Sequence, residues 1–221
     1  MNLMATFQQY LEYRLNQTLP GKPAQQKMAP HPINGENSPR HYEPAHDDFR
    51  NSSVLAPIIS WGDEIEIVLT LRTKSINHGG QLSFPGGGKE GDETIEETAL
   101  REAHEEIGLH PEHVKTIGKL TPLYVGHSDN MVTPVVGFLN TRQKFTPNPN
   151  EVDEIITVPL HDFVKPEKFI TEEWKLRDVP YNVPFWKIHH VPLWGATAMM
   201  MSELVELYRE FLDEGKRAGS F

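Results

Sequence analysis

The sequence predicts an α/β domain built in stacked layers, and three features of the chain indicate it. Short runs rich in β-branched residues recur between residues 53 and 160, a long helical segment interrupts them at 92–107, and a second helical segment follows at about 196–216. A few helices mixed among many strands favour a layered α/β domain over a regular strand–helix–strand array. The 221 residues suffice for one domain with a sizeable core.

Residues 1–50 are expected to form an extension that precedes the domain proper at 51–221. Its first part predicts a short amphipathic helix over 3–17, because apolar side chains recur at every fourth position: Leu3, Phe7, Leu11, Leu15. The stretch 18–50 is rich in proline, asparagine, histidine and glutamine, a composition typical of an irregular, extended connection.

The strands of the domain are predicted from runs of β-branched and aromatic residues. The first two, VLAPIIS and EIEIVLTLRT, flank a turn at 61–63. Further strands are expected, in chain order, at KTIGKL, PLYVG, MVTPVVGFLN and EVDEIITVPL. The last of these follows PNPN, whose prolines and asparagines favour a turn.

Two helices are predicted inside the domain. In the segment 92–107, Asp92 is expected to cap the N-terminus and Gly108 to end the helix. In the segment 196–216, apolar residues recur at helical spacing and form a stripe: Met200, Leu204, Leu207, Tyr208, Phe211. The stripe predicts that one face of this helix packs in the core.

The composition narrows the range of functions. The chain has no cysteine, which excludes disulfides, thiolate metal ligands and cysteine nucleophiles and fits a reducing cytoplasm. Its net charge of −10 gives no general attraction to nucleic acid or to anionic membranes. No apolar run approaches the ~20 residues that span a bilayer, and the N-terminus lacks the layout of a secretory signal. We therefore expect a cytoplasmic protein without nucleic-acid or membrane partners.

Three glutamates share one face of the helix predicted at 92–107. At 100° per residue, Glu105 and Glu106 lie about −60° and about +40° from Glu102, within an arc of about 100°. An apolar stripe borders this arc, so the carboxylates are expected at the rim of the core, where their repulsion is weakly screened. A hard divalent cation such as Mg²⁺ or Mn²⁺ would remove that repulsion. A solvated acidic face is the alternative that helix geometry alone leaves open.

The residues around these glutamates resemble the Nudix box. Gly87 is followed after five residues by Glu93, and after seven more by REAHEEIGL, which starts at Arg101. Ala103 stands where the family often has a bulkier aliphatic residue. The resemblance implies an α/β/α sandwich with a mixed central sheet. It also implies a hydrolase that uses Mg²⁺ or Mn²⁺ to cleave the diphosphate bond of a nucleotide-derived small molecule.

The resemblance implies a role for each residue of the box. Glu102, Glu105 and Glu106 are expected to bind the metal ion, together with the main chain of Gly87. Glu93 and Arg101 are expected to form an ion pair that orients the loop before the helix. For Arg101, an ordinary surface ion pair is the alternative.

The reaction also needs a general base, which takes a proton from the water that attacks phosphorus. Glu102 is one candidate. Glu151 and Glu154, in the stretch PNPNEVDEI, are two others, because Nudix enzymes can supply the base from a loop outside the box. A solvated entry to a strand is the alternative for these two residues.

The segment before the box is similar to the coenzyme A pyrophosphatase branch of the family. It reads VLTLRTKSINHGGQLSFPGGGKE, and a later segment, VPFW followed by WGATA, matches as well. From this resemblance Arg72, His78 and Gln81 are candidates for substrate contacts, with structural roles as the alternative. Asn77 departs from the branch, which has a second basic residue there; Lys74 could replace its charge but not its bidentate geometry.

The expected function is hydrolysis of coenzyme A or its derivatives to 3′,5′-ADP and a 4′-phosphopantetheine product. ADP-ribose, nucleoside-diphosphate sugars, dinucleoside polyphosphates and nucleoside triphosphates are alternative substrates, and a non-catalytic Nudix-like binding module is a further alternative. Tyr181, Trp186 and Trp194 could stack on an adenine or pack in the core. His189 and His190 are expected at the surface, and the oligomeric state stays open, with a homodimer as one option.

Overall fold

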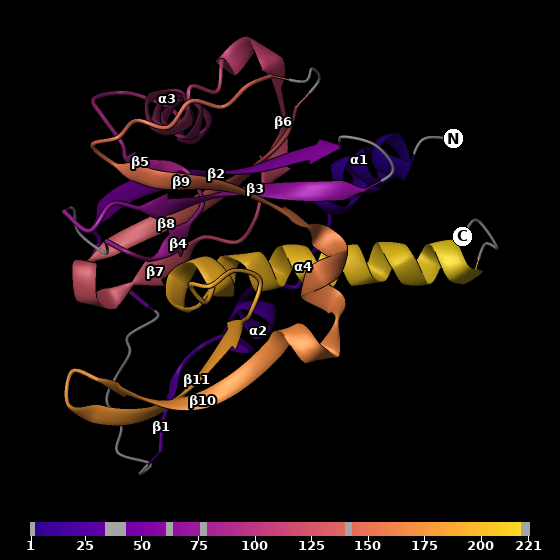
Figure 1. Cartoon of the computed structure of the whole chain (residues 1–221). Coiled ribbons are helices and arrows are strands. Elements are labelled where there is room, and N and C mark those ends of the chain that lie inside the picture. Colours follow the sequence, from indigo (N-terminus) through magenta and orange to yellow (C-terminus); the bar gives the residue numbers. More distant parts are fainter. Residues whose placement is uncertain (1–2, 34–42, 61–63, 76–78, 140–142, 218–221) are drawn as a thin grey trace.

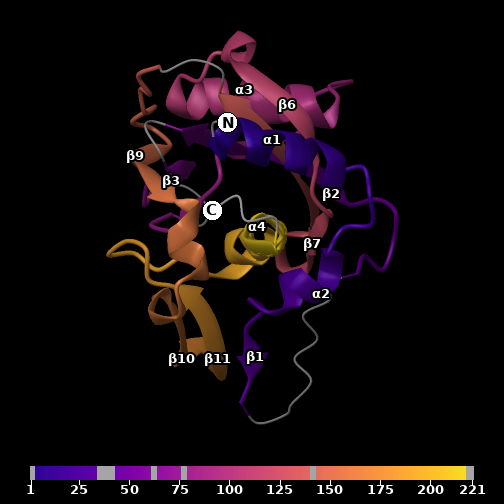
Figure 2. The same ribbon diagram turned by 90° about the vertical axis from the view of Figure 1, so that its right-hand side faces the viewer.

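The computed structural model describes residues 3–33, 43–60, 64–75, 79–139 and 143–217. An eight-stranded sheet is covered on one face by helix α3 (Ile95–Ile107) and on the other by helix α4 (Gly195–Arg217), and a small second sheet lies beyond α4 (Figure 1). Figure 2 shows α4 end-on between the two sheets. The predicted α/β/α layering is therefore confirmed.

The large sheet mixes parallel and antiparallel pairs, as expected. Its strands are β2 (Arg50–Ser60), β3 (Ile65–Arg72), β4 (Leu82–Ser83), β5 (Gly86–Gly88), β6 (Val114–Lys119), β7 (Leu123–Val125), β8 (Asn130–Leu139) and β9 (Val152–Pro159). β2 runs parallel to β8, whereas the pairs β2–β3, β3–β9 and β6–β8 are antiparallel. Within the described part of the chain β9 pairs with β3 alone, so β9 forms an edge of the sheet. The turn expected at 61–63 lies outside the described residues.

Helix α3 begins two residues later than the sequence indicated. Thr94, not Asp92, is the N-terminal cap: its hydroxyl accepts the N–H of Glu97, and the Glu97 carboxylate accepts the N–H of Thr94. This reciprocal capping box satisfies two main-chain donors at once, which a lone aspartate does not. The predicted end is confirmed, because Gly108 adopts the left-handed conformation with φ 67°.

The sheet separates two hydrophobic cores. On one face, Ala99, Ala103 and Ile107 of α3 pack against β2 and its neighbours. On the other face, all five apolar residues predicted for the stripe of α4 are buried: Met200, Leu204, Leu207, Tyr208, Phe211. Among the described residues, no helix is both long and apolar enough to cross a membrane.

The N-terminal segment is more ordered than its composition indicated. Helix α1 (Leu3–Arg14) matches the predicted helix, and its Phe7 and Leu11 are completely buried. The expectation of an irregular stretch is wrong for helix α2 (Gly21–Gln26) and the short strand β1 (His31–Pro32). Contacts with α4 stabilise α2, and proline is tolerated in the first turn of a helix. The domain boundary at residue 50 stays a prediction.

The second sheet was not predicted from the sequence. It pairs β1 with β11 (Val179–Trp186) and β11 with β10 (Phe169–Leu176), all antiparallel. β10 alternates only weakly between exposed and half-buried side chains, so its sequence lacks the signal of a half-buried strand. The described residues also form four 3₁₀ turns: η1 (Pro111–His113), η2 (Gly126–Ser128), η3 (Leu160–Val164) and η4 (Pro166–Lys168).

Candidate active site

The glycine strand β5 runs directly beside the acidic face of α3. Gly86 has φ 156°, and a Cβ there would meet the carbonyl oxygen of Ser53 at 2.4 Å. At Gly87 a Cβ would lie 2.6 Å from the carboxylate of Glu102. Glycine is therefore required if the main chain is to approach the carboxylates so closely.

Arg101 connects this strand with three of the carboxylates. It donates to both oxygens of Glu93 at 2.7 and 3.2 Å, and to the carbonyl of Gly88 at 2.9 Å. It also donates to Glu102 at 3.0 Å and Glu105 at 3.1 Å. The bond from Arg101 is the main reason why the pKa of Glu93 falls to about 2. An arginine with this many partners orients the loop and the helix together, which is more than an ordinary surface ion pair does.

Glu106 is almost fully buried, with 2% of its surface exposed. Its two oxygens have distant donors, Arg72 Nη1 at 3.3 Å and the N–H of Gly86 at 3.3 Å. Charge-assisted hydrogen bonds are usually 2.7–2.9 Å long. Burial is the main cause that raises the pKa of Glu106 to about 7, and burial also raises the pKa of Glu102.

These residues fit a hard divalent cation. The donors are all oxygens, which Mg²⁺ and Mn²⁺ prefer. The buried carboxylate of Glu106 is short of positive charge, and the space that a Cβ of Gly87 would fill lies directly against Glu102. Glu105 is different, because half of its side chain (50%) is exposed and Arg101 holds it at the outer side of the cluster.

The two candidate bases outside the box, Glu151 and Glu154, have different surroundings in the structure. The charge of Glu151 acts on both Glu102 and Glu106 and raises their pKa values, and Asn148 donates to its carboxylate at 3.0 Å. Glu154 instead lies with an oxygen 3.3 Å from Nε2 of His189. Glu151 therefore faces the acidic cluster, and Glu154 faces the segment before α4.

The three expected substrate contacts have different positions. Arg72, at the end of β3, reaches Glu106 with its side chain. The Gln81 carbonyl accepts the N–H of Arg72 at 3.0 Å, which ties the end of β3 to the residue before β4. His78 lies outside the described residues. The structure thus brings the Arg72 side chain to the acidic cluster. Gln81 contacts the main chain of Arg72.

A histidine pair near Glu154 was not recognised as part of a cluster from the sequence. Ligand atoms of Glu154, His189 and His190 lie within 4.8 Å of one another, although the residues are far apart in the chain. His190 is exposed as expected, whereas only 14% of the His189 side chain is. The N–H of Val191 donates to Nδ1 of His189, which leaves the proton on Nε2 facing Glu154. His189 and Glu154 are therefore in polar contact, with Nε2 3.3 Å from the carboxylate.

The aromatic residues divide between core and rim. Tyr181 and Trp186 are buried, and the indole of Trp186 donates to the carbonyl of Phe163 at 3.2 Å. Their packing role is thus confirmed. Trp194 is half-buried and makes an edge contact with Trp174, with ring centroids 5.3 Å apart.

Comparison with known proteins gives relatives across most of the chain. The NUDIX domain family matches residues 50–178. The peroxisomal coenzyme A diphosphatase NUDT7 of Mus musculus is 38% identical over 131 residues, which are 58% of this chain and 55% of that protein. The chain thus matches about half the length of this mouse relative. The uncharacterized Nudix hydrolase NudL of Pectobacterium atrosepticum is 34% identical over 75% of this chain and 86% of that protein.

Solved structures support the fold. The Nudix hydrolase RenU from M. smegmatis superposes with a TM-score of 0.50 at 20% identity, over 73% of this chain and 86% of that one. The NUDIX domain of Shewanella oneidensis NrtR, crystallised with ADP ribose, also gives a TM-score of 0.50, at 16% identity over 78% and 94% of the two chains. Family match, identity and fold agree, and this chain belongs to the Nudix hydrolase family.

Proposed function

We propose that this chain is a metal-dependent diphosphatase that cleaves the diphosphate bond of a nucleotide-linked small molecule. One observation carries the proposal: the carboxylates of Glu102 and Glu106 both lie against the glycine strand β5, and Arg101 holds Glu102 in place. Buried carboxylates of this kind are unfavourable unless a cation binds among them. Members of the family use divalent metal ions, and Mg²⁺ or Mn²⁺ suits these oxygens.

A bound divalent ion would neutralise diphosphate oxygens and favour ionisation of the attacking water. Glu102, Glu105, Glu106 and the main chain of Gly87 would hold it. Arg101 fixes Glu102 and Glu105 from the outer side, and its bonds to Glu93 and Gly88 keep the loop in place. These contacts fix the carboxylates before substrate arrives, so little reorganisation is needed during the reaction.

Glu151 is the better candidate for the general base than Glu154. Its carboxylate is held by Asn148 and acts electrostatically on Glu102 and Glu106, whereas Glu154 pairs with His189. A base must come within hydrogen-bonding reach of the attacking water, directly or through one further water. Glu102 stays an alternative. Glu151→Gln should lower kcat at saturating metal, while Glu154→Gln should leave kcat unchanged.

Coenzyme A or a derivative is the proposed substrate, with 3′,5′-ADP and a 4′-phosphopantetheine compound as products. The motif with Arg72 and Gln81 supports it, and so does the similarity to a mouse protein named as a coenzyme A diphosphatase. ADP-ribose and nucleoside-diphosphate sugars are the second candidates, since Asn77 replaces an expected basic residue. Turnover of coenzyme A is to be compared with turnover of its 3′-dephospho form. Equal rates would exclude recognition of the 3′-phosphate.

The diphosphatase activity itself is tested separately. A panel of coenzyme A, ADP-ribose, nucleoside-diphosphate sugars and nucleoside triphosphates is incubated with Mg²⁺ or Mn²⁺, and products are identified by mass. Cleavage of a phosphoanhydride bond in any member supports the proposal. A panel without any cleavage would favour the non-catalytic binding module. A homodimer and a cytoplasmic location stay predictions, which sedimentation and localisation in cells would check.

A further inference from the structure

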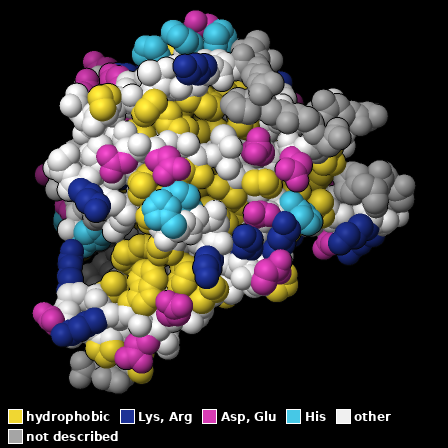
Figure 3. All heavy atoms as spheres, in the orientation of Figure 1, with side chains coloured by type: hydrophobic (Ala, Val, Ile, Leu, Met, Phe, Trp, Pro, Cys, Tyr) yellow, Lys and Arg dark blue, Asp and Glu magenta, His cyan; other side chains and the backbone are white. Residues whose placement is uncertain are grey.

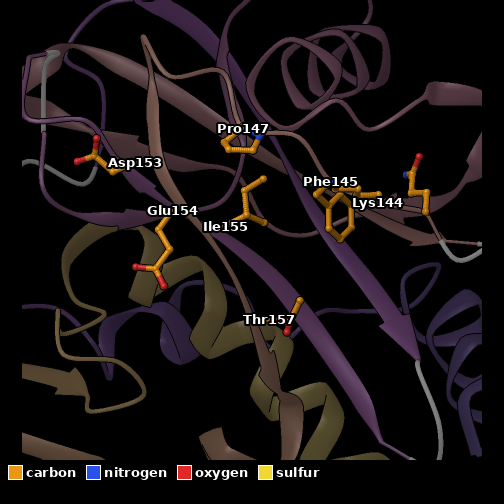
Figure 4. A pocket seen from close by; sticks show the side chains of 8 residues that line it. Lys144, Phe145, Pro147, Asp153, Glu154, Ile155 and Thr157 are labelled. Atoms are coloured by element: carbon orange, nitrogen blue, oxygen red, sulfur yellow. The ribbon is translucent and has the colours of Figure 1, made fainter.

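An open groove runs along β9 on the edge of the large sheet. Its volume is about 730 Å³, within the range of sites that bind small molecules. The segment 143–147 forms one wall and β9 forms the other (Figure 4). Its floor is apolar, with Phe145, Pro147 and Ile155, and hydrophobic side chains also gather on this face in the space-filling view (Figure 3).

One end of the groove is close in sequence to Glu151, whose charge acts on Glu102 and Glu106. Asp153, which lines that end, follows two residues after Glu151, so at most about 7 Å of extended chain separates them. The pairing of β9 with β3 is irregular here, because Leu71 faces Glu154 while Arg72 faces Val152, and Asp153 is the extra residue. Such bulges redirect side chains at sheet edges. This short separation would let a substrate bound at the cluster extend into the groove.

The charges of the groove determine which part of a substrate it accepts. Asp153 and Glu154 lie at one end of the groove, and Lys144 lies at the other end (Figure 4). Two carboxylates at the entrance repel a phosphate-bearing group. The apolar floor favours a neutral chain with methylene and methyl groups.

One polar atom in the wall has no hydrogen-bond partner within the described part of the chain. Nε2 of Gln143 is buried and unpaired, while Oε1 of the same side chain lies 3.2 Å from Nδ1 of His113. A buried donor without an acceptor is unfavourable. The carbonyl oxygen of an amide in a ligand would supply the missing acceptor.

We propose that this groove binds the non-nucleotide arm of the substrate, as a neutral, flexible chain that contains amide groups. The nucleotide half, with its phosphates, then lies on the other side of the acidic cluster. The inference rests on the proposed diphosphatase function and adds the orientation of the substrate. It makes the groove a determinant of substrate specificity that is separate from the residues of the box.

Thr157→Trp tests the groove, because Thr157 is an exposed residue of β9 that lines it. Tryptophan suits a strand and would fill the groove without changing the core. Thr171→Trp is the matched control, since Thr171 is an equally exposed threonine on β10 of the other sheet. Two substrates are compared: coenzyme A, and the methyl ester of 3′-phospho-ADP, which keeps the nucleotide and the diphosphate but lacks the arm.

For Thr157→Trp we expect KM for coenzyme A to rise about tenfold with kcat unchanged, and both constants for the methyl ester to stay as in the wild type. Thr171→Trp should change neither, and both variants should unfold at the wild-type temperature. Equal effects on the two substrates, or no effect on either, would overturn the groove assignment but leave the diphosphatase intact. If the wild type cleaves neither substrate, the proposed hydrolysis of coenzyme A is wrong, and the groove assignment that rests on it is wrong as well.

Discussion

Two glutamates of the described chain are buried to nearly the same extent, Glu106 on α3 and Glu203 on α4, but their surroundings differ. Glu203 is completely inaccessible and accepts three short bonds: from the N–H of Gly21 at 2.9 Å, and from the N–H and hydroxyl of Thr121 at 3.0 and 2.7 Å. Glu106 has two donors, both at 3.3 Å. The first carboxylate is satisfied by the protein alone, and the second is not.

The number and distance of hydrogen-bond donors distinguish these two glutamates, whereas their burial does not. Glu203 joins the start of α2 and the end of β6 to α4, so it stabilises the fold. The donors around Glu106 are too few and too distant to offset its desolvation, which is why its pKa is raised. A buried carboxylate that lacks donors indicates a binding site, whereas one with a full set indicates a structural contact.

The largest effect is expected from Glu106→Gln. Losing a charged ligand should reduce kcat by more than about 100-fold, since even residues that only support a ligand cost 10–100-fold when they are removed. Stability without metal should stay equal or rise, because the neutral amide removes an unsatisfied buried charge. Activity and thermal unfolding of the two proteins would be measured in parallel. Glu112→Gln, at an exposed position (69%), is the control.

Without added metal, the stability of the wild type should depend on pH through Glu106. Its pKa is about 7 in the folded protein and 4.5 in the unfolded chain, so the folded state holds the proton more tightly. This contribution, up to about 3 kcal/mol, is complete below pH 4.5 and is lost as the pH rises through 7. Unfolding of wild type and Glu106→Gln in urea between pH 5 and 8.5 should show the difference. Mn²⁺ at pH 8.5 should stabilise the wild type only.

Glu203→Gln should have the opposite profile to Glu106→Gln. The amide keeps one acceptor oxygen but points an NH₂ group at donors, so the free energy of unfolding should fall by about 1–3 kcal/mol. The activity of the folded protein should stay within twofold of the wild type. Glu206→Gln on the same helix, in ion pairs with Lys27 and Arg209 at the surface, should cost less than about 1 kcal/mol. An equal loss in both variants would contradict a special role for Glu203.

The smallest effect is expected from Gly87→Ala, which tests whether the close approach of β5 to Glu102 matters. Gly87→Ala would place a methyl group against the carboxylate of Glu102, which must move away; we expect about a tenfold loss in kcat/KM and a weaker affinity for Mn²⁺. Gly88→Ala meets nothing within 4 Å and should be neutral. Calorimetric titration with Mn²⁺ reads the affinity directly. If the two alanine variants behave alike, close approach at Gly87 is unimportant.

The sequence predicted the local features well. The helix with Glu102, Glu105 and Glu106, its end at Gly108 and the apolar stripe of α4 follow from the 3.6-residue period and from the conformational freedom of glycine. The pair Glu93–Arg101 followed from the resemblance to the box. These features depend on residues close together in the chain, so a single sequence contains enough information to predict them.

Other features needed the folded chain. The bond between Arg72 and Glu106 spans 34 residues, and the contact of Glu154 with His189 spans two distant segments. The start of α3 was wrong by two residues, because both Asp92 and Thr94 suit a cap and only the partner Glu97 decides between them. Helix α2 was missed, since a proline-rich segment becomes helical here through its contacts with α4.

By itself, then, the sequence determined the layered fold, the acidic helix and the family, because periodicity and motif spacing are local properties. Only the tertiary structure decided which buried glutamate is satisfied and which is not, which candidate base acts electrostatically on the cluster, and where a groove lies along β9. Those properties depend on distances between segments far apart in the chain, and desolvation and charge act over such distances in three dimensions.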